Sequence, residues 1–145
     1  MERKEEKPEK ISLRYPVVLV HGVGYRQRKH VNYWGRIPRC LEDRGAQIFY
    51  TGHDAWGDLE HNGEIICRDI QEILNKTGAE KVNIIAHSNG GIEARYTISS
   101  LGMAPYVASL TTLCTCHHGS KTMDRLLQFP PVLYRISAVF VNCFF

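Results

Sequence analysis

Ser88 is the residue whose neighbours suggest chemistry most clearly. It lies in the segment 86–91 (AHSNGG), directly after the apolar run 81–87 (KVNIIAH). Small residues two positions before and after a serine permit the sharp strand-to-helix turn that presents the hydroxyl as a nucleophile. The bare pattern also occurs at serines that only cap a helix. Its position between an expected strand and an expected helix favours Ser88 as a nucleophile for acyl transfer.

Acyl transfer through a serine needs N–H groups that face the oxyanion of the intermediate. The residue after the serine, Asn89, would supply one through its backbone. The segment 21–24 (HGVG) follows the apolar run 16–20, and the N–H of Val23 would supply the second if the two strands are neighbours. A plain glycine turn is the simpler alternative. A phosphate-binding loop is disfavoured, because no Gly-Lys-Ser/Thr follows and the spacing is not G-x-G-x-x-G.

The elements that must hold these residues alternate between strand and helix patterns. Continuous apolar runs that stop at glycine or polar loops are typical of buried parallel strands, and apolar spacings of three and four are typical of helices. The expected order is strand 16–20, helix 33–44, strand 46–50, helix 59–76, strand 81–87, helix 90–100 and strand 106–115. This alternation predicts an α/β fold with a mostly parallel sheet, helices on both faces and reactive groups at the carboxyl ends of the strands.

The length of 145 residues and the hydrophobic content of 43% suit one compact domain. Residues 1–10 are mostly charged and have little to bury, so we expect a flexible tail before a domain over residues 11–128. No apolar signal sequence follows the tail, which predicts a cytoplasmic protein. Five cysteines cannot all pair, and the scattered Lys and Arg residues behind the net charge of +3 argue against nucleic acid as a partner.

Several segments, in order along the chain, resemble the bacterial triacylglycerol lipases of the α/β-hydrolase superfamily. They are Tyr15–Gly24, Tyr33–Pro38, Gly45–Ala46, Lys81–Gly91 with Ala94–Tyr96, and His117–Ser120, and together they cover about residues 11–127. The resemblance implies a serine lipase or esterase that acts on acylglycerols or related carboxylic esters of lipids. No cofactor is expected.

The resemblance also assigns roles to residues of the predicted site. Ser88 matches the nucleophile, and Val23 and Asn89 match the oxyanion donors. Ala86 stands where most members have glycine, which is a mild departure. Cys116 stands where members usually have proline, and this change touches no catalytic group.

The superfamily places the acid and the histidine of its triad after later strands. Downstream of Ser88 the chain offers Glu93, and then Asp124, His117 and His118, which match family positions before the cap rather than the triad. We therefore interpret the sequence as the N-terminal half of such a hydrolase, truncated before the later strands. On its own the chain is expected to be inactive or nearly so.

Residues 129–145 (FPPVLYRISAVFVNCFF) resemble the hydrophobic start of the cap, or lid, of these lipases. The stretch is shorter than the roughly 20 residues of a membrane-spanning helix. We expect it to be covered by protein or to contact a lipid or membrane surface.

Other histidines lie near these motifs. His87 adjoins Ser88, but an elbow would turn its side chain away, and His21 is better placed to order the oxyanion loop than to act as a base. His53 and Asp54 follow the expected strand 46–50 and would reach the mouth of the site, although a polar loop surface is the simpler interpretation.

Two further alternatives are weaker. Cys114, Cys116, His117 and His118 lie close together, but the C-x-C spacing differs from that of zinc sites and no second ligand pair is evident, so no metal site is expected. A non-catalytic domain would keep the α/β fold and bind a lipid or a partner through its apolar end or an open sheet edge. Such a module has no evident need for both an elbow and an HGVG loop, which favours the hydrolase.

Overall fold

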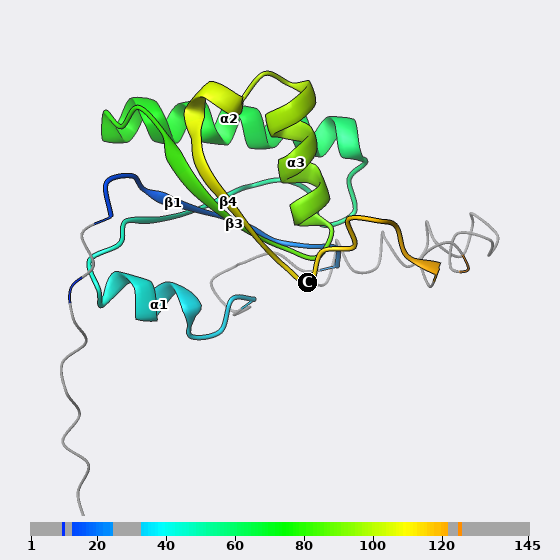
Figure 1. Ribbon diagram of the computed structural model, residues 1–145, viewed down its shortest axis with the longest axis horizontal. Helices are drawn as coiled ribbons and strands as arrows, with labels where there is room; N and C mark the ends of the chain where they lie inside the picture. The colour runs from blue at the N-terminus through cyan, green and yellow to red at the C-terminus, as the bar shows by residue number, and fades with distance from the viewer. Residues whose placement is uncertain (1–9, 11–12, 25–32, 122–124, 126–145) are drawn as a thin grey trace, which may run out of the picture.

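The computed structural model describes residue 10, residues 13–24, residues 33–121 and residue 125. Four parallel strands form one sheet in the order β2-β1-β3-β4. They are β1 (Val17–Val20), β2 (Ile48–Tyr50), β3 (Val82–His87) and β4 (Val107–Leu113). The helices are α1 (Ile37–Glu42), α2 (Leu59–Thr77) and α3 (Gly90–Ser100), and a short 3₁₀ turn, η1 (Ala104–Tyr106), precedes β4. Because α1 lies on one side of the sheet and α2 and α3 lie on the other (Figure 1), the predicted α/β architecture is confirmed.

Each face of the sheet has its own apolar core, because successive side chains of a strand point to opposite faces. In β1, Val18 and Val20 pack with isoleucines of α2. Val17 and Leu19 belong to the second core, together with Trp34. All four residues of β1 are almost completely buried. The loop that follows β1 therefore starts from a strand that is packed on both sides.

Capping residues define the two ends of α2, and its apolar face packs against the sheet. The side chain of Asp58 caps the helix by accepting a hydrogen bond from the N–H of His61 at 2.8 Å. Gly78 ends it in the left-handed conformation, with φ of +69°. Ile66, Ile70 and other apolar residues then face the sheet, as the predicted periodicity requires.

The helix predicted over residues 33–44 is wrong at both ends, because α1 spans only Ile37–Glu42. Gly35 and Gly45 adopt positive φ values of +58° and +97°, which bound the short helix with turns. Trp34 lies in the first of these turns and is buried in the α1-side core. The apolar spacing thus arises from a turn and a short helix rather than from one long helix.

The other elements lie close to their predicted ranges. α3 occupies the predicted residues 90–100. β4 ends at Leu113 rather than at residue 115, because Cys114 takes a φ of +52°. β2 begins at Ile48 rather than at residue 46, since Ala46 still belongs to the turn after α1.

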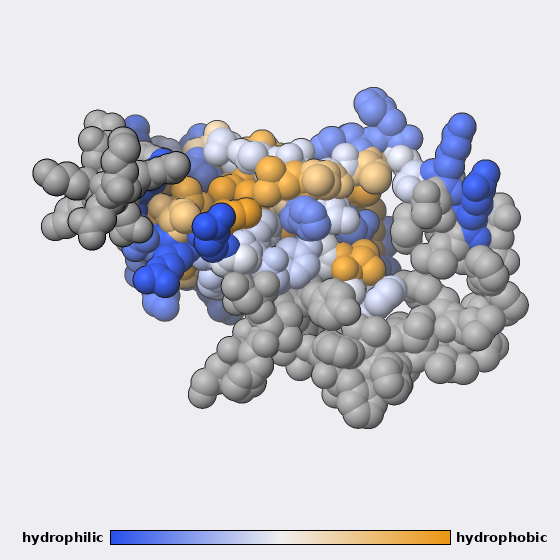
Figure 2. Space-filling model, turned by 90° about the horizontal axis from the view of Figure 1, so that it is seen from below, coloured by the Kyte–Doolittle hydropathy of each residue, from blue (hydrophilic) through white to orange (hydrophobic). Residues whose placement is uncertain are grey.

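The α1 side of the molecule retains apolar surface. Seen from below, apolar side chains form a band across this side (Figure 2). Ile48, Ile85 and Leu113 are only partly buried in the α1-side core. The described part of α1 therefore covers its face of the sheet incompletely.

Some predictions fall elsewhere in the chain. The tail over residues 1–10, except Lys10, and the apolar segment 129–145 lie outside the described residues. Among the helices that the structure describes, none is long and apolar enough to cross a membrane.

Candidate active site

Ser88 occupies a strained turn between β3 and α3. Its φ is +55°, a left-handed conformation that is uncommon for a residue other than glycine. The N–H of Ser88 donates to the carbonyl of Leu113 at 2.8 Å, and its carbonyl accepts from the hydroxyl of Thr115 at 2.9 Å. Strain of about 1–3 kcal/mol persists only where surrounding contacts fix the backbone. The turn has the geometry expected of a nucleophile elbow at the carboxyl end of β3.

Close packing against β1 requires small residues two positions before and two positions after Ser88. The backbone of Gly90 passes so close to the end of β1 that a Cβ atom there would overlap the carbonyl oxygen of His21. Ala86 is fully buried and pairs with Val20 of β1. One methyl group is therefore accommodated before the serine, and none after it.

The HGVG loop lies directly beside this turn, because β1 and β3 are neighbours in the sheet. The N–H of Gly22 donates to the Tyr33 hydroxyl at 2.8 Å, and the N–H of Gly24 donates to the carbonyl of Ala55 at 3.1 Å. Between them, the N–H of Val23 has no acceptor among the described residues, and the same holds for the N–H of Asn89. Both predicted donors are therefore available to a ligand.

A pocket of about 340 Å³ brings the predicted site residues together. The described residues that line it are Val23, Ser88, Asn89, Ile92, Cys116, Gly119 and Ser120. All three predicted site residues thus face one cavity. Ile92 gives this cavity an apolar wall next to the serine.

The histidines nearest in sequence to the site are engaged elsewhere. The Nδ1 of His87 lies 2.5 Å from the Tyr33 hydroxyl, and the His87 ring is edge-on to the ring of Trp34. The Nδ1 of His21 lies 2.9 Å from the carbonyl oxygen of Gly22, and the ring stacks on that of His53. Burial, with the charge of His53 as a second cause, lowers the pKa of His21 to about 4. Neither ring hydrogen-bonds to Ser88.

A sequence profile of the alpha/beta hydrolase fold matches residues 15–136 of the chain. The chain belongs to this family. A triacylglycerol lipase of Vibrio cholerae is 38% identical to this chain over 112 residues, which are 77% of this chain and 35% of the relative. A triacylglycerol lipase of Pseudarthrobacter phenanthrenivorans is 36% identical over 142 residues, which are 90% of this chain and 44% of the relative. The chain spans less than half the length of these curated relatives.

Solved structures share the fold of this chain. The mature form of Bacillus licheniformis lipase BlEst2 superposes with a TM-score of 0.71 at 22% identity, over 86% of this chain and 50% of that one. The metagenomic carboxyl esterase MGS0156 gives a TM-score of 0.65 at 15% identity, over 83% of this chain and 37% of that one. The resemblance to lipases of the α/β-hydrolase superfamily is confirmed.

The loop after β2 differs from its prediction. His53 was expected on a polar loop surface, but its side chain is 1% exposed, and its Nε2 lies 3.2 Å from Oε2 of Glu93. The His53 side chain points inward, where its Nδ1 lies 2.8 Å from the Thr51 hydroxyl. Asp54 does lie partly exposed, where it pairs with His61 at 3.1 Å. His53 therefore lies within the core beside Glu93 instead of lining the mouth of the site.

The Cys/His cluster has a different organisation from a metal site. Arg95 donates to Nδ1 of His117 at 2.9 Å, and Nε2 of His117 lies 3.0 Å from the Thr112 hydroxyl. Cys114 and Cys116 are free thiols at the surface. Among the residues that the structure describes, no three His, Cys, Asp or Glu side chains are grouped to hold a metal ion.

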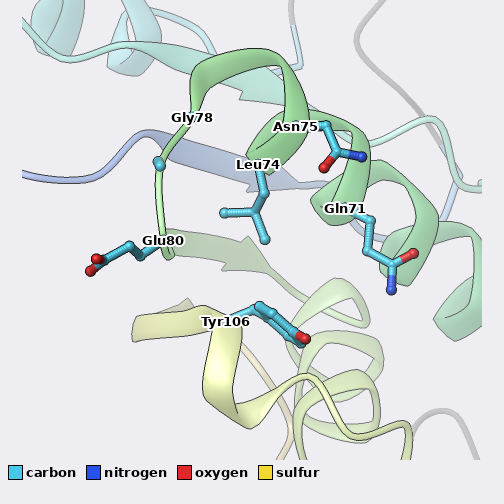
Figure 3. A pocket seen from close by; sticks show the side chains of 7 residues that line it. Gln71, Leu74, Asn75, Gly78, Glu80 and Tyr106 are labelled. Carbon is cyan, nitrogen blue, oxygen red and sulfur yellow. The ribbon is translucent and has the colours of Figure 1, made fainter.

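A larger hollow of about 580 Å³ lies away from the predicted site. Leu74 and Gln71 of α2 face Tyr106 across it, and Glu80 lies at its side (Figure 3). Glu80 and Tyr106 precede β3 and β4, so this hollow is at the amino ends of the strands. Chemistry in open α/β sheets occurs at the carboxyl ends, which is where Ser88 lies.

Sequence reasoning missed the supporting roles of Tyr33, Asn62 and Glu93. The Tyr33 hydroxyl joins the HGVG loop to His87. Asn62 and Glu93 are 1% and 2% exposed and hydrogen-bond to each other. The positions of Asn62 and Glu93 could have indicated these roles. Each is a polar residue on the apolar face of its helix, where it requires a buried partner.

Proposed function

We propose that this chain carries the acylation machinery of a serine ester hydrolase that acts on carboxylic esters of lipids. The observation that carries the proposal is the left-handed turn at Ser88, which faces one pocket together with the N–H groups of Val23 and Asn89, neither of which has an acceptor among the described residues. The lipid substrate class is supported by the triacylglycerol lipases among the relatives.

The proposed reaction begins when Oγ of Ser88 attacks the ester carbonyl carbon. The carbonyl oxygen becomes an oxyanion and accepts hydrogen bonds from the N–H groups of Val23 and Asn89. The bond to the leaving alcohol then breaks, the alcohol takes up the proton lost by Ser88, and an acyl-enzyme remains. Water hydrolyses this ester in the second half of the reaction.

Proton transfer from Ser88 requires a base, and no described histidine hydrogen-bonds to its hydroxyl. We infer that the 145-residue chain, tested alone, turns over esters far more slowly than a complete triad hydrolase and is inactive or nearly so. Its oxyanion donors would still favour attack at Ser88, since a triad hydrolase without triad residues keeps roughly 10³-fold acceleration or more.

Phosphonylation by a fluorophosphonate at alkaline pH tests the proposal, because hydroxide can take the Ser88 proton that no described histidine accepts. Oγ of Ser88 would bond to phosphorus, fluoride would leave, and hydroxide would take the proton. Ser120 lines the same pocket and serves as the internal reference. We expect mass spectrometry of peptides to show Ser88 labelled at least about tenfold faster than Ser120, since the oxyanion donors act only at Ser88.

Two variants complete the design. Ser88→Ala should abolish the fast label, and Ser120→Ala should leave it unchanged. Equal labelling of the two serines in the original chain would contradict the hydrolase proposal and favour a non-catalytic binding domain.

A further inference from the structure

Five polar side chains from separate elements are buried together next to the Ser88 turn. His21 follows β1, Thr51 and His53 follow β2, Asn62 is on α2 and Glu93 is on α3, and each is at most 5% exposed. We call these five residues the buried polar cluster. Buried polar and charged groups are costly unless each finds a partner. The partners therefore show what the cluster holds in place.

One carboxylate oxygen of Glu93 is held by two asparagines. Its Oε1 accepts from Nδ2 of Asn62 at 2.8 Å and from Nδ2 of Asn89 at 2.9 Å. The backbone of Asp54 orients the Asn62 amide, because its N–H donates to Oδ1 at 3.0 Å and its carbonyl accepts from Nδ2 at 2.8 Å. Oε1 is an acceptor in both bonds. Any proton on Glu93 is consequently on the other oxygen, Oε2.

That second oxygen faces His53. The Nε2 of His53 lies 3.2 Å from Oε2 of Glu93 and 3.2 Å from the carbonyl oxygen of His21. Among the described residues, Oε2 has no aligned hydrogen-bond donor. Oε2 is thus a buried oxygen that lies against the Nε2 of His53.

The contacts of His53 place a proton between its ring and Glu93. The Thr51 hydroxyl lies 2.8 Å from Nδ1 of His53 and 3.3 Å from the carbonyl oxygen of Leu19. On the other side of the ring, Nε2 faces two oxygens, which would repel its lone pair if neither partner held a proton there. One proton therefore lies between His53 Nε2 and Glu93 Oε2, carried either by the ring or by the acid.

We propose that the Glu93–His53 pair positions the two oxyanion donors of the site, an inference that rests on the proposed function. Glu93 holds Asn89 twice, through Oε1 and through its N–H, which donates to the Asn89 carbonyl at 3.1 Å. His53 holds the carbonyl of His21, two residues before Val23. The shared proton links the elbow to the oxyanion loop and keeps the N–H groups of Val23 and Asn89 at a fixed separation.

Three variants separate this role from simple support of the fold. Glu93→Ala removes both links. Glu93→Gln keeps an acceptor for the two asparagines and offers an amide N–H to Nε2 of His53, which imitates the protonated acid. Asn89→Ala removes only the bond to Oε1 and leaves the buried polar cluster intact. Glu72→Ala removes an exposed glutamate of α2 and is the matched control.

Two measurements are made on each variant, with circular dichroism as the check of folding. The first is the ¹H–¹⁵N signal and hydrogen exchange of the Val23 and Asn89 amides. The second is the phosphonylation rate of Ser88 relative to Ser120. We expect Glu93→Ala to shift the Asn89 amide signal. Asn89→Ala should speed hydrogen exchange at the amide of residue 89 beyond the intrinsic difference between Asn and Ala. Both variants should lower the rate ratio about tenfold, part of the loss on removing an oxyanion donor. Glu93→Gln should stay within about threefold of the original chain, and Glu72→Ala should not change.

The proposal is overturned if folded Asn89→Ala keeps both the corrected exchange rate of its residue 89 amide and its rate ratio. If Glu93→Ala fails to fold, Asn89→Ala decides the matter, since the buried carboxylate is untouched. The amide measurements do not depend on reactivity. An unreactive Ser88 combined with the expected amide shifts would therefore reject the proposed function and retain the positioning role.

Discussion

Gly22 lies against Ser88 so closely that a Cβ atom at Gly22 would stand 2.7 Å from the Cβ of Ser88. The same atom would stand 3.0 Å from the carbonyl oxygen of His87 and 3.0 Å from the Tyr33 hydroxyl. Carbon atoms that are not bonded do not approach to 2.7 Å without displacement. The oxyanion loop and the nucleophile turn therefore meet at a point where only a hydrogen atom fits.

Gly22→Ala is expected to separate these two segments. The added methyl group must push the loop away from Ser88. The carbonyl oxygen of His87 is a backbone atom and the Cβ of Ser88 is bonded to the backbone, so neither can move aside by a side-chain rotation. Overpacking of this kind costs about 1–3 kcal/mol of unfolding free energy. The labelling of Ser88 relative to Ser120 should fall by about tenfold or more, since the N–H of Val23 would move with the loop.

Gly52→Ala is the matched control for this substitution. A Cβ atom there would meet only Oδ2 of Asp69 at 3.9 Å, an ordinary contact. Denaturant titration and phosphonylation of both variants would check the prediction. Equal labelling of Ser88 in the two variants would show that the contact with Gly22 does not matter for reactivity.

Tyr33→Phe should loosen the same loop without adding any atom. The Tyr33 hydroxyl accepts from the N–H of Gly22 at 2.8 Å and lies 2.5 Å from Nδ1 of His87. Its removal leaves two polar groups without this partner, at a cost of about 1–3 kcal/mol. Urea denaturation would measure the loss, with Tyr106→Phe as control because Tyr106 is 44% exposed. A loss no larger than that of the control would contradict the role assigned to this hydroxyl.

The sequence predicted the elbow well, because a strand, a sharp turn and a helix each leave a local pattern. The residues 86–91 place Ser88 where the structure has it, between β3 and α3. The proximity of Val23 depended on β1 and β3 being neighbours, which the sheet order confirms. Sequence periodicity identifies strands but not their order, so this step needed the structure.

The support beneath the elbow was not predictable in the same way. The contact between His53 and Glu93 joins residues 40 positions apart, from a loop and a helix. Loops carry no periodicity that would report burial, and His53 was therefore expected at the surface. The helix predicted over 33–44 is too long for a related reason. Apolar spacing does not reveal that Gly35 and Gly45 adopt left-handed conformations, which bound the helix on either side.

The unfolding free energy should depend on pH through His21, and this dependence gives the last prediction. Burial first, and then the charge of His53, lowers the pKa of His21 in the folded protein from 6.5 to about 4. Above pH 6.5 the ring is neutral in both states, so its contribution to stability is fully present. Between these two values the unfolded chain binds a proton that the folded chain does not. Stability must therefore fall as the pH falls, by at most about 3 kcal/mol in total.

His21→Asn isolates this contribution. The variant is less stable at every pH because it loses the stacking on His53, so the slope of unfolding free energy against pH, measured by urea titration, is the quantity to compare. Between pH 6.5 and about 4 the slope should be smaller in His21→Asn than in the original chain. His118→Asn changes an exposed ring and should keep the original slope. Parallel curves for His21→Asn and the original chain would mean that His21 is not held neutral by its burial.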